Sequence, residues 1–92
     1  MRFKYDRAKS ERLKKDPRRK FGFEEVKEIW THYHYVDVRS DDPEQFRVIG
    51  WVKGKLYTVI YEVREDMTGE YYHLVTLWKS TKHEEQLYEK NI

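Results

Sequence analysis

The sequence contains no cysteine, and no run of apolar residues approaches the roughly 18 to 20 that a membrane-spanning helix needs. Without cysteine, disulfide bonds and thiolate chemistry are excluded, which fits a reducing compartment. The first fifteen residues lack the apolar stretch that a signal peptide requires. We therefore expect a cytoplasmic protein with no membrane partner.

Glycine is scarce too, and the four glycines are scattered singly, so no glycine-rich phosphate loop is present. No serine lies in the context of a nucleophile elbow, which leaves hydrolase chemistry of the triad type without support. His32 and His34 occupy alternate positions and could share one face of a strand. No third metal ligand accompanies them, since Asp37 falls on the other face. We expect neither a metal nor a cofactor.

What the chain does have is charge and aromatic rings. Its 92 residues are 39% charged, 38% hydrophobic and 16% aromatic, which favours one folded domain spanning residues 1–92. The net charge is only +2, yet residues 1–20 hold ten Lys or Arg against three acids. A basic segment of this kind can attract nucleic acid, although most charged runs are simply solvated.

The first third of the chain predicts a short strand and two helices. Arg2 to Tyr5 alternates polar and apolar residues, as a strand does. Asp6 is a suitable N-cap for a helix over Ala8 to Lys15, which Pro17 ends. A second helix begins near Phe23, and its apolar positions fall at helical spacing. These positions are Phe23, Val26, Ile29, Trp30 and Tyr33.

The rest predicts antiparallel strands and one more helix. The strands are rich in β-branched and aromatic residues. They cover residues 35–38, 46–52, 55–64 and 71–79. Gly54 suits a tight hairpin with a glycine bulge, and residues 65–69 form a longer hairpin loop. Thr81 and Glu84 fit a capping box that starts a helix ending near Lys90. The fold class is α+β, with three to four antiparallel strands in a curved sheet and the helices packed on one face.

Alternation along these strands places cations and aromatic rings together. Arg47, Ile49 and Trp51 share one face of their strand, while Lys79 and Trp78 fall on opposite faces of the last one. Such side chains can hold phosphates and stack on bases. They can equally be ordinary features of a sheet, because tyrosine and tryptophan favour strands and lysines protect sheet edges. The pattern leaves both interpretations open.

Three stretches, in order, resemble the BrnT family of bacterial toxins, which has a RelE-like fold. They are "FEEVKEIW" from Phe23, "FRVIGWVKGKLYTVIYEVRE" from Phe46 and "HLVTLWKSTKHEEQLYE" from His73. The opening "FKYDRAKS" also looks like the start of that family. The resemblance implies a metal-independent ribonuclease that cleaves mRNA. It also implies neutralisation by a ribbon-helix-helix antitoxin of the BrnA type, in a hetero-oligomer.

The resemblance assigns roles to particular residues. Arg47 and Lys79 match basic positions, whereas Glu84 and Tyr88 match the acid and tyrosine of the final helix. The chain departs from the family at Trp78, where an arginine is usual, and in "DPRRKFGF", where Lys-His-Gly is usual. We predict RNA contacts from the basic and aromatic residues on these stretches. They are Arg18, Arg19, Lys20, Trp51, Lys53, Lys55 and Trp78.

For cleavage, Arg47 and Lys79 would stabilise charge on the phosphate. Tyr88 would make a polar contact, and His73 or His83 would transfer protons, since histidine titrates near neutrality. Each has a structural alternative: Arg47 pairs with Glu62, Lys79 protects an edge and Tyr88 anchors the core. The alternative function is a RelE-fold module that binds RNA or a protein partner without cleavage.

Overall fold

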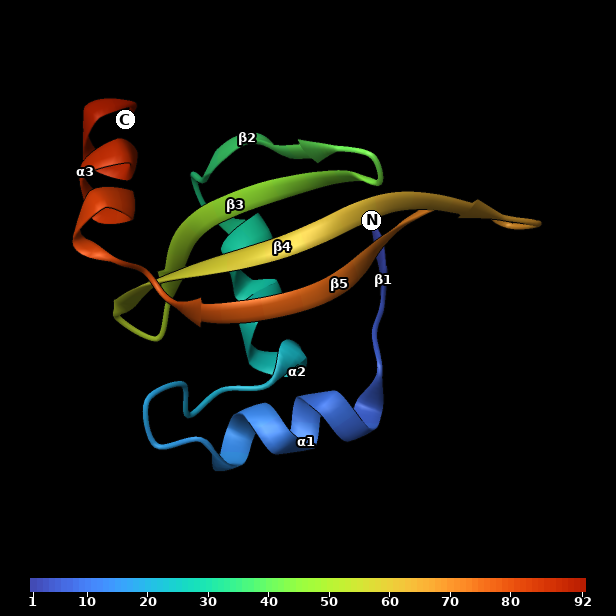
Figure 1. The fold of residues 1–92 in the computed structure, drawn as a ribbon, viewed down its shortest axis with the longest axis horizontal. Coiled ribbons are helices and arrows are strands. Elements are labelled where there is room, and N and C mark those ends of the chain that lie inside the picture. Colours follow the sequence, from blue (N-terminus) through green and yellow to red (C-terminus); the bar gives the residue numbers. More distant parts are fainter.

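The structure is a computed structural model that describes all 92 residues as a five-stranded sheet with helices on both sides (Figure 1). The strands lie in the order β1-β5-β4-β3-β2. Strands β2 to β5 pair antiparallel, whereas β1 pairs parallel to β5 at one edge. The α+β class is confirmed, and the sheet is mixed. The elements are β1 Arg2–Lys4, α1 Arg7–Lys15, α2 Phe23–Val26, the 3-10 helix η1 Lys27–Thr31, β2 Tyr35–Asp41, β3 Glu44–Val52, β4 Lys55–Asp66, β5 Gly69–Lys79 and α3 Lys82–Lys90.

The main core lies on the face of the sheet that α1, α2 and η1 cover, here called the core face. Phe23, Val26 and Ile29 are fully buried there, as the helical spacing predicts. They pack with Val48 and Val59, which point to that side from β3 and β4. Tyr33 does not join them and is 52% exposed, because the helix ends at Thr31. No helix is both long enough and apolar enough to cross a membrane.

Helix α3 packs on the opposite face, here called the α3 face. Tyr88 is buried against Ile49 and Leu56 in a second, separate apolar cluster. Ile49 follows Val48 along β3, so the two side chains point to opposite sides of the sheet. The expectation that all helices lie on one face is therefore wrong. Apolar side chains of β3 and β4, such as Ile49 and Leu56, also point to this second face, and α3 covers them.

The helix ends follow their capping residues. The Asp6 carboxylate accepts a hydrogen bond from the Lys9 backbone N–H at 3.2 Å, which starts α1. Both halves of the capping box form at α3, since the Thr81 N–H donates to Glu84 at 2.8 Å and the Glu84 N–H donates to Thr81 at 3.2 Å. Helix α1 ends at Lys15, before Pro17. Local sequence therefore determined these boundaries.

The hairpins and one bulge set which side chains share a face. Lys53 and Gly54 form a two-residue turn with φ of 48° and 82°, so the β3–β4 hairpin needs no bulge there. The loop after β4 is shorter than expected, because pairing continues to Asp66 and Gly69. A bulge lies instead in β5, where the register shifts beside Ile60. Leu74 and Leu77 consequently both point into the core, and the simple alternation predicted for this strand is wrong.

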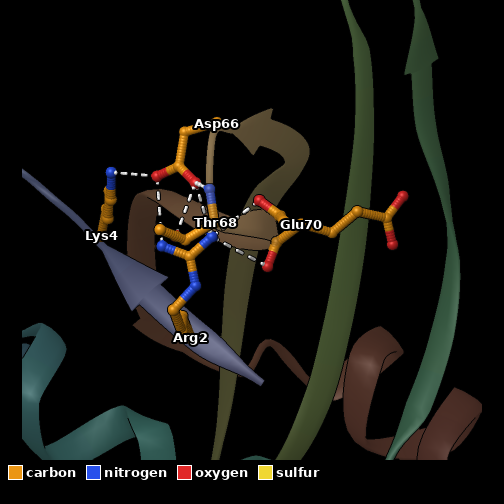
Figure 2. Close-up of polar contacts among 6 residues, drawn as sticks. Arg2, Lys4, Asp66, Thr68 and Glu70 are labelled. Carbon is orange, nitrogen blue, oxygen red and sulfur yellow. Dashed lines mark hydrogen bonds and ion pairs between the residues drawn. The ribbon is translucent and has the colours of Figure 1, made fainter.

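Strand β1 is held at the edge by a group of ion pairs around Asp66 (Figure 2). The Asp66 carboxylate accepts from Arg2 at 2.8 and 3.1 Å and from Lys4 at 2.7 Å. Arg2 also donates to the Gly69 carbonyl at 2.6 Å. Arg2 and Lys4, together with the N–H and hydroxyl of Thr68, hold the pKa of Asp66 well below its usual range. This contact joins the first strand to the β4–β5 turn.

Candidate nucleic-acid interface

An open pocket of about 240 Å³ lies between the loop after α1 and the end of β5. Arg18, Arg19, Trp78 and Lys79 line it. The sequence predicts RNA contacts for Arg18, Arg19 and Trp78 and a catalytic role for Lys79, and these residues come from segments about sixty residues apart along the chain. Figure 1 shows this loop close to the C-terminal end of β5. The fold therefore gathers three cations and one indole at a single place.

The loop takes this position because β5 has a free edge there. Strand β1 pairs only with Tyr71 to His73, so the later part of β5 lacks a neighbour on that side. The Arg19 guanidinium donates to the Leu77 carbonyl at 2.9 Å on this edge. The Tyr57 hydroxyl in turn donates to the Arg19 carbonyl at 2.6 Å. Arg19 is thus both a structural contact and part of the pocket wall.

The pocket has an excess of positive charge. Asp16 is the one carboxylate paired with its cations, and it contacts Arg19 at 2.6 Å and Arg18 at 3.7 Å. The Arg18 N–H and the Arg19 side chain lower the pKa of Asp16. The Arg18 side chain is 89% exposed, and Lys79 is exposed with no carboxylate within 4 Å. Three cations against one acid leave net positive charge for an anion.

Trp78 connects this pocket to the start of α3. Its indole N–H donates to Glu84 at 2.9 Å, and the same carboxylate oxygen accepts from the Thr81 backbone. Glu84 is only 5% exposed. On the α3 face the Arg39 guanidinium lies 5.4 Å from the centre of the Trp78 ring. The indole is therefore held by a buried carboxylate and a cation, which positions it at the pocket.

Arg47 lies in a different environment. Its guanidinium makes two hydrogen bonds to Asp37, one of them at 2.9 Å, and lies 3.7 Å from Glu84. The predicted alternative pair with Glu62 is wrong, because Glu62 accepts instead from Gln45 and Arg64. Two carboxylates balance the charge of Arg47. Arg47 and Asp37 pair across the strands on the α3 face, whereas Lys79 pairs with the core-facing Tyr57, so the structure separates the two cations.

Two of the other proposed catalytic residues, Tyr88 and His73, do not lie beside Lys79. Tyr88 is 6% exposed and its hydroxyl donates to the Tyr33 carbonyl at 3.4 Å, so it is a core anchor. His73 lies opposite Glu62 in the part of β5 that pairs with β1. Burial lowers the pKa of His73, and the nearby Arg64 lowers it further. His83 is exposed in the first turn of α3, four residues beyond Lys79.

The remaining predicted RNA contacts do not line the pocket. Lys53 is exposed in the β3–β4 turn and Lys55 is exposed at the start of β4. This hairpin is next to the end of β5, because the Ser80 N–H donates to the Leu56 carbonyl at 3.0 Å. Trp51 is 42% exposed, and its ring contacts the edge of Tyr88 on the α3 face. Lys20 is exposed at a left-handed position, with φ of 67°, directly after the pocket loop.

Sequence reasoning missed Arg39 and Asp16, which act through neighbours brought close only by folding. The capping box identified Glu84, but its contacts with Trp78 and Arg47 carry no signal in the sequence. No group of three or more His, Asp or Glu side chains is arranged to hold a metal ion. A scan against protein-family models and a search of curated proteins both returned no match for this chain.

Proposed function

We propose that the protein binds single-stranded RNA in the pocket of Arg18, Arg19, Trp78 and Lys79 and cleaves it without a metal, as a toxin of the BrnT type. The observation that supports this most is the convergence of three cations and an indole, with one partnering carboxylate, from distant segments. Guanidinium and ammonium groups bind phosphates, and an indole face stacks on any base. The RelE-like fold and the resemblance in sequence are part of the same proposal.

Cleavage would proceed through the ribose 2′-hydroxyl. A base removes its proton, the oxygen attacks the adjacent phosphorus and the bond to the 5′-oxygen breaks as that oxygen gains a proton. The products are a 2′,3′-cyclic phosphate and a 5′-hydroxyl, and no cofactor is consumed. Lys79 and Arg18 would stabilise charge on the pentacoordinate phosphorus. His83, exposed near the strand end, would transfer a proton.

A second candidate is RNA binding without cleavage. It is favoured by the positions of two residues chosen for catalysis. Arg47 is already neutralised by Asp37 and Glu84, and the hydroxyl of Tyr88 contacts only a backbone carbonyl. Neither group is free to act on a phosphate in the pocket. Lys79, the two arginines and Trp78 would still hold an RNA strand.

A protein partner is part of the first proposal. The edge strand β2 exposes Val36 and Val38 to 42% and 56%, on the face opposite Asp37. An unpaired strand edge with apolar side chains is a surface on which another chain can add. A ribbon-helix-helix antitoxin of the BrnA type would cover it. If the sheet instead serves only to bind a protein, the wild type would show no affinity for RNA. Alanine at Val36 and Val38 would then abolish binding of the partner.

The test is cleavage of a labelled single-stranded RNA in excess chelator by the wild type, Lys79→Ala and Lys90→Ala. Lys90 is exposed at the end of α3 and serves as a control for loss of one charge. We expect cleavage to survive chelation, to fall by about 10²-fold in Lys79→Ala and to be unchanged in Lys90→Ala. Binding that depends on Lys79 without any cleavage would select the second candidate. Wild-type protein that neither binds nor cleaves RNA would refute both.

A further inference from the structure

A second pocket, of about 340 Å³, lies at the other end of α1. Its wall comes from the β1–α1 junction and the first residue of η1. The lining residues are three cations and two aromatic rings, with no acid among them. They are Phe3, Lys4, Tyr5, Arg7 and Lys27.

Two of these cations have no ion-pair partner. Neither Arg7 nor Lys27 has a carboxylate within 4 Å, whereas Lys4 forms an ion pair with Asp66 at 2.7 Å. The Lys27 ammonium lies 6.0 Å from the centre of the Tyr5 ring. Tyr5 also packs on Phe23, with ring centres 5.3 Å apart, so the ring is anchored in the core. Two free cations on an anchored wall are suited to one phosphate group.

Helix α1 connects the two pockets. Its nine residues span about 14 Å, from Arg7 at the second pocket to Lys15 just before the loop of the first. Arg12 and Lys15 are exposed on α1, and the one acid within this helix, Glu11, is paired with Lys14 at 3.4 Å. Figure 1 shows α1 running from the base of β1 to the loop near the end of β5. The positive charge therefore continues from one pocket to the other.

We infer that α1 and its two flanking pockets form one track for a single RNA strand, in which Arg7 and Lys27 bind a backbone phosphate several nucleotides away from the one held by Lys79. This rests on the proposed RNA binding at the first pocket. The second pocket then contributes affinity and a minimum substrate length, while the cleaved bond stays at the first.

The test compares Arg7→Ala/Lys27→Ala with Lys82→Ala/Lys90→Ala, which removes two exposed cations without ion-pair partners from the two ends of α3. Affinities are measured by fluorescence anisotropy for single-stranded RNAs of 4 and 14 nucleotides across a salt series. We expect the first double variant to bind the 14-mer about 10-fold more weakly and to bind the 4-mer as the wild type does. Its salt dependence for the 14-mer should be shallower by about 0.7 in log–log slope, since one phosphate contact is lost. Circular dichroism and thermal unfolding verify that each variant is folded.

Three outcomes would overturn the inference. One is an equal loss in the control double variant, which would mean a diffuse charge effect. Another is unchanged affinity for the 14-mer in the Arg7→Ala/Lys27→Ala variant. If inorganic phosphate still shifted the NMR signals of Arg7 and Lys27 in the wild type, the pocket would be a site for free anions and not for RNA. The third is an equal loss for both lengths. The variant Lys79→Ala tests the proposed function separately from the track, because it should weaken binding of the 4-mer most. A wild type that binds neither RNA would refute both the proposed function and the track.

Discussion

The α3 face and the end of β5 both carry cations, but only the first also carries the carboxylates to match them. Arg47 lies between Asp37 and Glu84 with 24% of its side chain exposed. Lys79, at the strand end, has no acidic partner, and Arg18 beside it shares Asp16 with Arg19. One Trp78 ring connects the two regions through its hydrogen bond to Glu84.

This difference separates cations that hold the protein together from cations that can bind a ligand. A guanidinium already bound to two carboxylates contributes little attraction to an incoming phosphate. An exposed ammonium with no partner contributes its full charge, and that attraction falls with salt. Residue type alone does not distinguish the two cases. The counterions, which come from other strands and from α3, do.

The largest effect should come from the α3 face. Tyr88→Ala removes a buried ring from contact with Ile49 and Leu56 and should lower the free energy of unfolding by about 3 kcal/mol. Tyr88→Phe should lower the free energy of unfolding much less, because the Tyr88 hydroxyl makes only one long hydrogen bond, of 3.4 Å to the Tyr33 carbonyl. Urea denaturation measures both. We expect Tyr88→Phe to retain RNA cleavage. Loss of cleavage in a fully folded Tyr88→Phe variant would make Tyr88 a catalytic residue, and the α3 face would no longer be purely structural.

Next is Arg47→Ala, which leaves Asp37 and Glu84 without their cation. We expect a loss of about 2 kcal/mol in unfolding free energy, less than for a fully buried pair because both partners are about one quarter exposed. RNA affinity, measured by anisotropy well below the unfolding midpoint, should change less than 2-fold. Lys79→Ala should show the reverse, with unchanged stability and weaker RNA binding. The opposite pattern in this pair would show that the two roles have been exchanged.

A smaller effect is expected for Glu84→Gln. The amide oxygen can still accept from Trp78 and from the Thr81 backbone, so only the charge facing Arg47 is lost. Thr81→Ala removes the other half of the capping box and should cost about 1 kcal/mol. Tryptophan fluorescence should change more in Glu84→Ala than in either of these. An unchanged spectrum in Glu84→Ala would mean that Glu84 does not position the indole.

The smallest effect should be the acid sensitivity of the α1–α2 junction, because the Glu24 side chain is 35% exposed and solvent screens its ion pair with Lys14. Burial alone would raise the pKa of Glu24, but hydrogen bonds from Lys14, Ser10 and Tyr5 lower it to about 2 from 4.5. Because the folded-state value is the lower one, this contribution is present above about pH 4.5 and is lost as the pH falls towards 2. Glu24→Gln should therefore lose stability at pH 6 and approach the wild type at pH 2.5. Unfolding by urea at the two pH values measures this, and a constant difference would contradict it.

Much of the fold could be predicted because it depends on local signals. Asp6, Thr81 and Glu84 gave the helix ends, and alternation gave the strands. The β5 bulge could not be predicted, since one extra residue changes the face of every side chain before it without changing composition. The side on which α3 packs was missed for a related reason. It depends on Ile49 and Leu56 together, which are neighbours only across the sheet.

The candidate site divides in the same way. Arg18, Arg19, Trp78 and Lys79 were proposed one by one, and the fold brings them together. Arg47 was proposed on equal grounds, yet its partner Asp37 lies ten residues earlier on a neighbouring strand and removes its free charge. The second pocket was missed because Lys27 lies twenty residues from Arg7 and looks like an ordinary solvated lysine. Only its position beside Tyr5 distinguishes it.

The parallel edge strand has a consequence for how the protein is made. Arg2 contacts Asp66, 64 residues later, and β1 pairs with β5 over a similar separation, with Arg2 opposite Tyr71. During synthesis β1 therefore stays without its partner at least until Tyr71 to His73 of β5 have been made. Contacts of such long sequence separation form late and slowly. Until then, the basic segment that begins with β1 is an unfolded polycation with no sheet to hold it.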